Sequence, residues 1–327
     1  MKELAIGIDI GGTNTQFGFV DREGNIVSTG KVSTQTHEDI KLYFKDLYEG
    51  ISSLQERLGD KYSVVGVGVG APNGNFYKGT VEHAPNLRWK GIIHFVDEFK
   101  QFWDVPTVLT NDANAAAIGE MMYGGARKMK DFIEITLGTG LGSGFVVNGQ
   151  LVYGNDGFAG ELGHTVVNPY GRICGCGRRG CLETYASATG IKRTVYKFLA
   201  DITEPSELRG VSFDNLSAKM ITEAAERGDR VALEAFEYTG RVLGQKLADA
   251  VAITSPEAIF LFGGLALSGD YIFEPTKRNM EENMLNIFKD KVKLLPSELQ
   301  NDNAAVLGAS ALVWKELDKV SKTKIKL

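Results

Sequence analysis

All three cysteines of this 327-residue chain lie within eight positions, and a histidine stands ten residues before the first of them. The four side chains are His164, Cys174, Cys176 and Cys181. Three thiolates and one imidazole complete a tetrahedral Zn²⁺ shell with no open position, which is typical of a structural site. A redox pair is one alternative, although the usual Cys-x-x-Cys spacing is absent, and chance clustering of buried cysteines is another. We therefore expect a structural zinc ion on these four residues.

Two glutamates stand close to the predicted zinc ligands, Glu161 just before His164 and Glu183 just after Cys181. A metal-bound imidazole has a fixed tautomer, so the other N–H of His164 becomes an oriented donor. Two carboxylates and one donor form a suitable rim for a polyhydroxylated ligand such as a sugar. A solvated loop surface is the alternative interpretation of the two glutamates.

Three glycine-rich turns follow predicted strands, at residues 9–13, 137–140 and 262–264. Such turns point backbone N–H groups at an anion, and the hydroxyls of Thr13 and Thr139 add donors. No Lys-Ser/Thr pair follows the glycines as in a P-loop, and Ser143 stands where a dinucleotide fingerprint needs glycine. Tight hairpins are the alternative for each turn alone. Together they predict phosphate binding, with Asp9 holding Mg²⁺ through water.

Asn111 and Asp112 stand where a predicted strand meets a helix, a position typical of binding sites in α/β sheets. Asp112 is able to accept a hydroxyl proton during attack on phosphorus, while Asn111 binds a neighbouring hydroxyl. A helix N-cap is the alternative, because both residue types are good caps.

Periodicity predicts the elements that position these residues. Helices are expected at 38–58, at 113–124, across a long helical region at 184–254, and at 302–317. Residues 6–27 and 133–152 share the order strand, Gly/Thr turn, strand, hairpin turn, strand. We interpret this echo as a weak duplication of two halves that enclose one ligand, although any two β-hairpins look somewhat alike.

The composition is that of a soluble globular protein with room for two domains, since 43% of the residues are hydrophobic and 24% are charged. The net charge of −5 provides no sequence-wide attraction to nucleic acid or to an anionic membrane. No apolar run reaches the roughly 20 residues that span a bilayer. Glu3 and Asp9 interrupt the apolar N-terminus, so no signal peptide is expected and the chain is predicted to be cytoplasmic.

Taken together, the motifs resemble the ROK family of sugar kinases and sugar-sensing repressors. The matching stretches are DIGGTNT at 9–15, LTNDANAAA at 109–117, LGTGLGSG at 137–144, GELGH at 160–164, CGCGRRGCLE at 174–183 and FGG at 262–264. The resemblance implies the actin-like ATPase fold, an α/β architecture of two ribonuclease-H-like domains with an interdomain cleft. We expect a smaller N-terminal domain of residues 1–114 and 303–327, and a larger domain of residues 115–302 that carries the zinc loop.

The resemblance also assigns roles to individual residues. It implies a catalytic base at Asp112 and structural zinc on the four ligands named above. The sugar hydroxyls are expected to be bound by Asn86, Asn111, Asp112, Glu161, His164 and Glu183. ATP and Mg²⁺ are expected at Asp9, Gly11, Gly12, Thr13, Thr139, Gly140, Gly263 and Gly264. A homodimer is the usual assembly of the family, although a tetramer stays open.

Within the family the chain is most similar to the bacterial glucokinases. The family's repressors carry a helix-turn-helix domain before the first strand, for which we expect no room here, and the fructokinase-type members arrange their zinc ligands differently. The expected reaction is ATP-dependent phosphorylation of a hexose at the 6-hydroxyl, with glucose favoured. N-acetylmannosamine and N-acetylglucosamine kinases share the zinc pattern and stay open. A non-catalytic sugar-sensing regulator and a metal-dependent module are the competing hypotheses. APNGNF at 71–76 departs from the Pro-Gly pair of many relatives.

Overall fold

The structure is a computed structural model that describes residues 1–299 and 303–324. The chain divides into two compact units. The first unit comprises Met1–Lys128, Leu151–Ala159 and the chain from Glu298 onward, and the second comprises Met129–Gln150 and Gly160–Ser297. In the described ranges no helix has the length and apolar character needed to cross a membrane.

The first unit contains a five-stranded sheet in the order β3-β2-β1-β4-β8. Its strands are β1 (Lys2–Ile10), β2 (Asn14–Val20), β3 (Ile26–Ser33), β4 (Tyr62–Ala71) and β8 (Thr107–Asn111). The first three strands run antiparallel, whereas β4 and β8 run parallel to β1. The carboxyl ends of β1, β4 and β8 therefore meet at one edge of the sheet.

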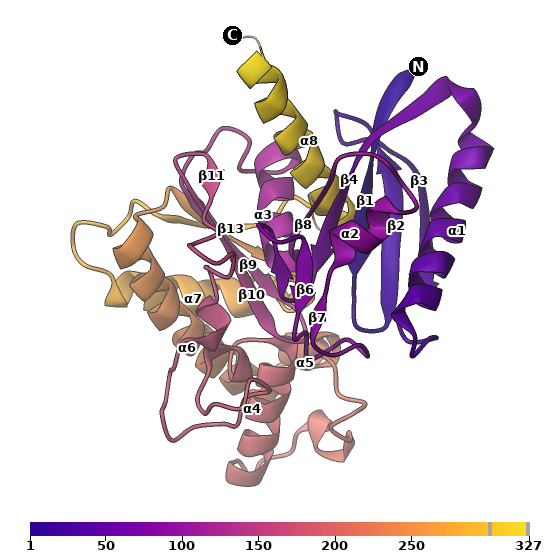
Figure 1. The fold of residues 1–327 in the computed structure, drawn as a ribbon. Coiled ribbons are helices and arrows are strands. Elements are labelled where there is room, and N and C mark those ends of the chain that lie inside the picture. The colour runs from indigo at the N-terminus through magenta and orange to yellow at the C-terminus, as the bar shows by residue number, and fades with distance from the viewer. Residues whose placement is uncertain (300–302, 325–327) are drawn as a thin grey trace. The chain divides into compact units, whose positions relative to one another are not determined.

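Helices cover both faces of this sheet (Figure 1). They are α1 (Ile40–Leu58), α2 (Phe95–Lys100), α3 (Asp112–Tyr123) and α8 (Ala304–Lys324). Leu4, Ile6 and Ile8 of β1 pack with α1 on one face, because side chains alternate along a strand. On the other face α8 lies against the strands at Gly68. A Cβ there would stand 1.9 Å from the Ala309 carbonyl oxygen, so only glycine allows this approach.

A small three-stranded sheet is inserted between β4 and α2. It consists of β5 (Gly74–Asn75), β6 (Thr80–Glu82) and β7 (Ile92–Ile93). Asn73 precedes it with a positive φ of 51°. The side-chain amide of Asn73 donates to the carbonyl of Glu82 at 2.9 Å. This side chain therefore closes a turn within the stretch APNGNF at 71–76.

The second unit repeats the sheet of the first, in the order β11-β10-β9-β12-β13. The strands are β9 (Phe132–Leu137), β10 (Leu141–Val147), β11 (Gln150–Leu151), β12 (Ala258–Phe262) and β13 (Lys293–Pro296). As in the first unit, a hairpin leads into two strands that run parallel to the first strand of that hairpin. The sequence echo between residues 6–27 and 133–152 thus corresponds to equivalent strands of two ribonuclease-H-like sheets.

Helices pack on the second sheet through Ile133 and Ile135. They are α4 (Ala188–Asp201), α5 (Ala218–Glu226), α6 (Arg230–Thr254) and α7 (Asp270–Asn283), with short 3-10 turns at η2 (Leu162–His164), η3 (Leu182–Thr184), η4 (Glu207–Gly210) and η5 (Ala266–Ser268). A further 3-10 turn, η1 (Gly59–Lys61), follows α1 in the first unit. The single helical region expected at 184–254 is wrong in detail, because capped starts at Ser187, Ser217 and Asp229 divide it.

The α/β class is as expected, but the compact units differ from the expected domain limits. A boundary after residue 114 falls inside α3, whereas the first unit continues to Lys128 because α3 packs on α8. Residues 151–159 also return to the first unit. Residue 302, the expected end of the larger domain and start of the last helix, lies outside the described residues.

Candidate active site and metal centre

Asp9 and Asp112 lie at the same edge of the first sheet. Asp9 pairs in register with Gly70 of β4, which in turn pairs with Thr110 of β8, and Asp112 begins α3 directly after that strand. A Cβ at Gly70 would stand 3.8 Å from Asp9 Oδ1 and 3.7 Å from Asp112 Cα. The two aspartates therefore flank a position without a side chain, and no motif of the sequence indicates that Gly70 belongs to the site.

Asp112 has the environment of a tuned carboxyl group. Asp112 is accessible to solvent, yet the surrounding protein displaces enough water to raise its pKa. The Ala113 N–H donates to Asp112 Oδ1 at 2.8 Å, and this hydrogen bond lowers the pKa by a smaller amount. Asn111 Oδ1 accepts from the same N–H at 2.9 Å. Asn111 is thus the N-cap of α3, which is the alternative interpretation of this residue.

Asp9 is half-buried at the end of β1. Burial, and then the nearby charge of Asp112, raise the pKa of Asp9 to about 7. Two neighbouring carboxylates repel each other, and a bound divalent cation offsets this repulsion. Carboxylate oxygens are also the ligands that Mg²⁺ prefers. The donor set therefore fits the expected magnesium ion.

The first glycine turn joins β1 to β2 and lies against the loop of Asn86. The N–H of Gly11 donates to the Asn14 carbonyl at 3.0 Å, which closes the turn and leaves Thr13 exposed. A Cβ at Gly12 would stand 3.0 Å from the Asn86 carbonyl oxygen. The first unit therefore brings together Asp9, Gly11, Gly12, Thr13, Asn86, Asn111 and Asp112.

The other two glycine turns share one edge of the second sheet. Thr139 and Gly140 lie between β9 and β10, and Gly263 and Gly264 follow β12, the parallel neighbour of β9. The N–H of Leu265 donates to the carbonyl of Leu137 at 3.2 Å and so links the two turns. The two turns therefore lie side by side at the carboxyl ends of β9 and β12.

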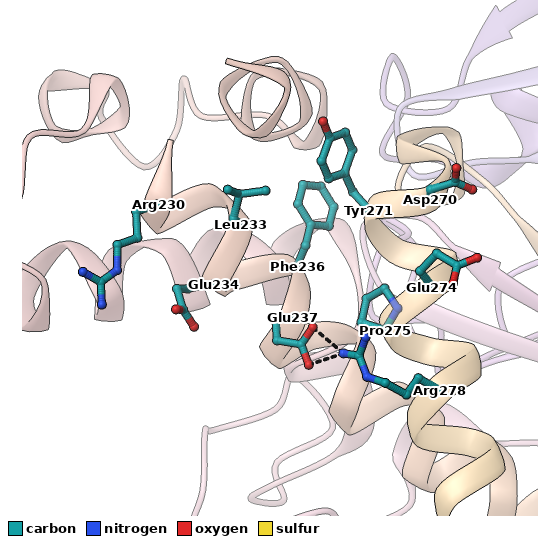
Figure 2. A pocket seen from close by; sticks show the side chains of 10 residues that line it. All are labelled: Arg230, Leu233, Glu234, Phe236, Glu237, Asp270, Tyr271, Glu274, Pro275 and Arg278. Atoms are coloured by element: carbon teal, nitrogen blue, oxygen red, sulfur yellow. Dashed lines mark hydrogen bonds and ion pairs between the residues drawn. The ribbon is translucent and has the colours of Figure 1, made fainter. Parts of the chain in front are cut away.

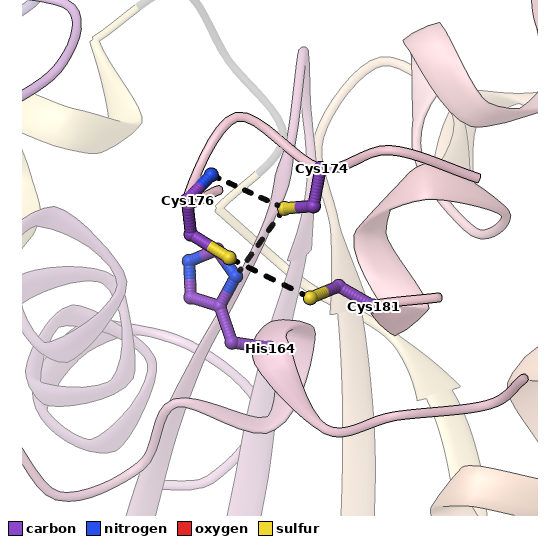
Figure 3. A group of neighbouring side chains, drawn as sticks. All are labelled: His164, Cys174, Cys176 and Cys181. Atoms are coloured by element: carbon purple, nitrogen blue, oxygen red, sulfur yellow. Dashed lines mark hydrogen bonds between the residues drawn. The ribbon is translucent and has the colours of Figure 1, made fainter. Parts of the chain in front are cut away.

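The predicted zinc ligands converge in the second unit (Figure 3). Their ligand atoms all lie within 4.8 Å of one another. The Sγ atoms of Cys176 and Cys181 are 3.6 Å apart, and Cys174 Sγ is 3.7 Å from His164 Nδ1. Sulfur atoms at the usual Zn–S distance of about 2.3 Å stand about 3.8 Å apart around a tetrahedral ion. The four side chains therefore fit zinc, with Nδ1 as the imidazole donor.

Arg172 fixes the shape of the loop that carries the cysteines. Its guanidinium donates to the carbonyls of Thr184 (2.7 Å) and Gly190 (2.9 Å) and to the Thr194 hydroxyl (2.9 Å), and it lies 4.5 Å from the Tyr185 ring centroid. These contacts tie the loop to α4. No motif of the sequence indicates this role of Arg172, because its partners lie up to 22 residues away.

Both glutamates of the predicted sugar rim adjoin the metal centre. Glu183 Oε1 is 2.8 Å from Cys174 Sγ, and Glu161 Oε2 is 3.9 Å from His164 Nε2. A Cβ at Gly140 would stand 2.7 Å from Glu183 Oε2, so the second glycine turn passes directly beside this carboxylate. The second unit therefore brings the zinc ligands, the rim carboxylates and the remaining glycine turns together.

A groove of about 420 Å³ lies elsewhere in the second unit, between α6 and α7 (Figure 2). None of the predicted site residues lines it. Its central ion pair joins Arg278 to both oxygens of Glu237, at 2.5 and 2.6 Å. Phe236 and Pro275, which also line it, are buried and belong to the packing of α6 against α7.

Comparison with known proteins places this geometry in a family. The model of the ROK family matches residues 5–316. The chain is 33% identical to the glucokinase of Halalkalibacterium halodurans, with 97% of each chain covered. It is 35% identical to a ROK family glucokinase from Streptomyces griseus solved in complex with glucose and AMPPNP, with a TM-score of 0.80 and coverage of 94% and 98% of the two chains. It is also 29% identical to the xylose repressor of Caldicellulosiruptor bescii, over 95% of this chain and 78% of the repressor. These similarities confirm the expected actin-like ATPase fold, and the chain belongs to the ROK family.

Proposed function

We propose that this protein is an ATP-dependent sugar kinase that phosphorylates a hexose at the 6-hydroxyl, with glucose as the favoured acceptor. The observation that carries the proposal is Asp112, an accessible carboxyl group with a raised pKa beside the half-buried Asp9. The similarity to glucokinases, one of them bound to glucose and AMPPNP, supports the same activity.

In the proposed mechanism Asp112 accepts the proton of the 6-hydroxyl as the hydroxyl oxygen attacks the γ-phosphorus of ATP. The bond between the γ-phosphorus and the β–γ bridging oxygen breaks, and ADP leaves. A base with a raised pKa is better matched to this transfer near neutral pH than an ordinary aspartate. Asp9 would hold Mg²⁺, which offsets the charge that develops on the phosphate oxygens. The glycine turns with Thr13 and Thr139 supply N–H and hydroxyl donors to the phosphates.

The proposed zinc ion has a structural role. It would be held by His164 Nδ1 and the three thiolates, which leaves no position for substrate. Metal binding fixes the tautomer of His164, so that Nε2–H, on the side of Glu161, becomes an oriented donor to a sugar hydroxyl. Glu161, Glu183, Asn86 and the Nδ2 of Asn111 complete the proposed sugar contacts.

A sugar-responsive regulator is the second candidate, because the chain is also similar to a xylose repressor. An assay of ADP release distinguishes the two, run with glucose, mannose, N-acetylglucosamine and N-acetylmannosamine as acceptors. We expect turnover with at least one sugar and the highest kcat/KM with glucose. Sugar binding without ADP release for any acceptor would favour the regulator.

The role of Asp112 is tested by Asp112→Asn, with Asp104→Asn, an exposed aspartate of the same unit, as control. We expect a loss of about 10²–10⁴-fold in kcat for Asp112→Asn, the range for removing a general base, with sugar affinity largely kept. An unchanged kcat would refute the assignment. A homodimer and a cytoplasmic location complete the proposal, and light scattering of the purified protein tests the first.

A further inference from the structure

Residues 153–159 form a closed loop immediately before the glutamate that we assign to the sugar. The N–H of Ala159 donates to the carbonyl of Tyr153 at 3.0 Å, so the loop returns to its starting point. The loop belongs to the first unit, and the chain enters the second unit at Gly160. The contacts that hold this loop therefore also fix the position of Ala159.

Asn75 of β5 holds the loop through a fully buried side chain. Its Nδ2 donates to the carbonyl of Asp156 at 2.8 Å, while its Oδ1 accepts the N–H groups of Tyr77 (3.1 Å) and Lys78 (3.2 Å). Gly157 has a φ of +92°, and a Cβ there would stand 2.7 Å from Asn75 Oδ1. Only glycine allows the loop to approach Asn75 so closely.

Aromatic residues on both sides strengthen this attachment. The Tyr77 hydroxyl donates to the carbonyl of Gly154 at 3.0 Å, and the rings of Phe76 and Tyr153 stack with their centroids 4.1 Å apart. The Tyr153 phenol also lies near the Thr110 side chain. Thr110 belongs to β8, which leads directly into Asp112, so the loop lies beside the strand that places the proposed base.

The chain is held again directly after the loop. Ser143 Oγ donates to the carbonyl of Gly160 and accepts the N–H of Leu162 at 3.2 Å. Glu161 lies between these two hydrogen-bonded neighbours. Ser143 therefore holds the backbone on both sides of Glu161, and the loop that Asn75 holds ends two residues before it.

We propose that Asn75 is a positioning residue for sugar binding, because it fixes the start of the segment that carries Glu161. The inference rests on the proposed function. Loss of the Asn75 side chain frees the loop and weakens the sugar contacts of Glu161. The nucleotide turns follow other strand ends, so the KM for ATP stays unchanged.

The test uses the full-length protein with Asn75→Ala and the milder Tyr77→Phe, whose side chain is 59% exposed and so not required for folding. Tyr48→Phe is the matched control, a tyrosine of the same unit that packs on Phe102 and Trp103. Hydrogen exchange of the backbone amides of residues 154–161 measures the attachment without ligand. Sugar KM, ATP KM and kcat measure its effect, and calorimetry gives the sugar Kd directly.

We expect exchange at residues 154–161 and the sugar KM and Kd to rise about tenfold in Asn75→Ala, the factor for one buried hydrogen bond. Tyr77→Phe should show the same pattern at about threefold, as for a more exposed bond. Unchanged exchange overturns the inference, and so does faster exchange with an unchanged sugar Kd. A wild-type chain that binds glucose but transfers no phosphate refutes the proposed kinase activity alone, since exchange and Kd still decide the role of Asn75.

Discussion

Replacing Asp9 by asparagine should stabilise the magnesium-free protein at neutral pH while it removes the proposed cation ligand. Burial and the neighbouring Asp112 raise the pKa of Asp9 from 3.8 to about 7. The folded state therefore favours the neutral carboxyl group. The stabilisation that the neutral Asp9 carboxyl group provides is fully present below pH 3.8 and is lost as the pH rises through about 7. Asparagine has nearly the same shape as the neutral form and does not ionise.

The two pKa values set the size of the effect. Their difference corresponds to about 4 kcal/mol of unfolding free energy above pH 7. Asp9 is only half-buried, so water screens part of this energy and we expect about 2–4 kcal/mol. More than half of the change should appear between pH 5 and pH 7, because the unfolded chain is already ionised at pH 5 while the folded chain is not.

Urea denaturation of the wild type and of Asp9→Asn at pH 5, 6, 7 and 8 measures this difference. The buffers omit magnesium and nucleotide, and they contain no chelator, so that the proposed zinc stays bound. The stability of Asp9→Asn relative to the wild type should rise with pH, and Asp104→Asn should show no such trend. A difference between Asp9→Asn and the wild type that is independent of pH would refute the reasoning. Saturating Mg²⁺ with a non-hydrolysable ATP analogue should reverse the order, because only the wild type retains the proposed ligand.

Three further predictions follow from the site and the core. Because the pKa of Asp112 is raised, the acid limb of the pH profile of kcat/KM should have its midpoint above about 3.9, the pKa of an ordinary aspartate. Activity should be lost as the pH falls through that midpoint, and a midpoint at or below about 3.9 would contradict the assignment. Cys176→Ser should lose zinc and weaken sugar binding, and full metal content by elemental analysis would disprove the ligand set. Gly68→Ala should lower the free energy of unfolding by about 1–3 kcal/mol, because its Cβ would stand 1.9 Å from the Ala309 carbonyl oxygen, and an unchanged urea midpoint would show that α8 does not lie as described.

Features confined to short stretches could be predicted from the sequence. The ligand types and spacing of the cysteine loop sufficed to predict the cluster that the second unit assembles, because four ligands within 18 residues need little tertiary structure to meet. The hairpins were equally local, and their echo between residues 6–27 and 133–152 corresponds to two sheets with the same strand order. Capped helix starts were less visible, so α4, α5 and α6 were predicted as one region.

Other features depend on strand order, which no local pattern encodes. Asp9 and Asp112 are 103 residues apart in sequence, and they meet only because β4 lies between β1 and β8 with Gly70 at the critical register. The attachment of loop 153–159 to Asn75 is likewise a contact between distant segments. The sequence by itself determined which groups are able to do chemistry and how neighbouring residues turn. Only the tertiary structure decided which carboxyl groups share a charge environment, because burial and proximity arise when distant strands pair.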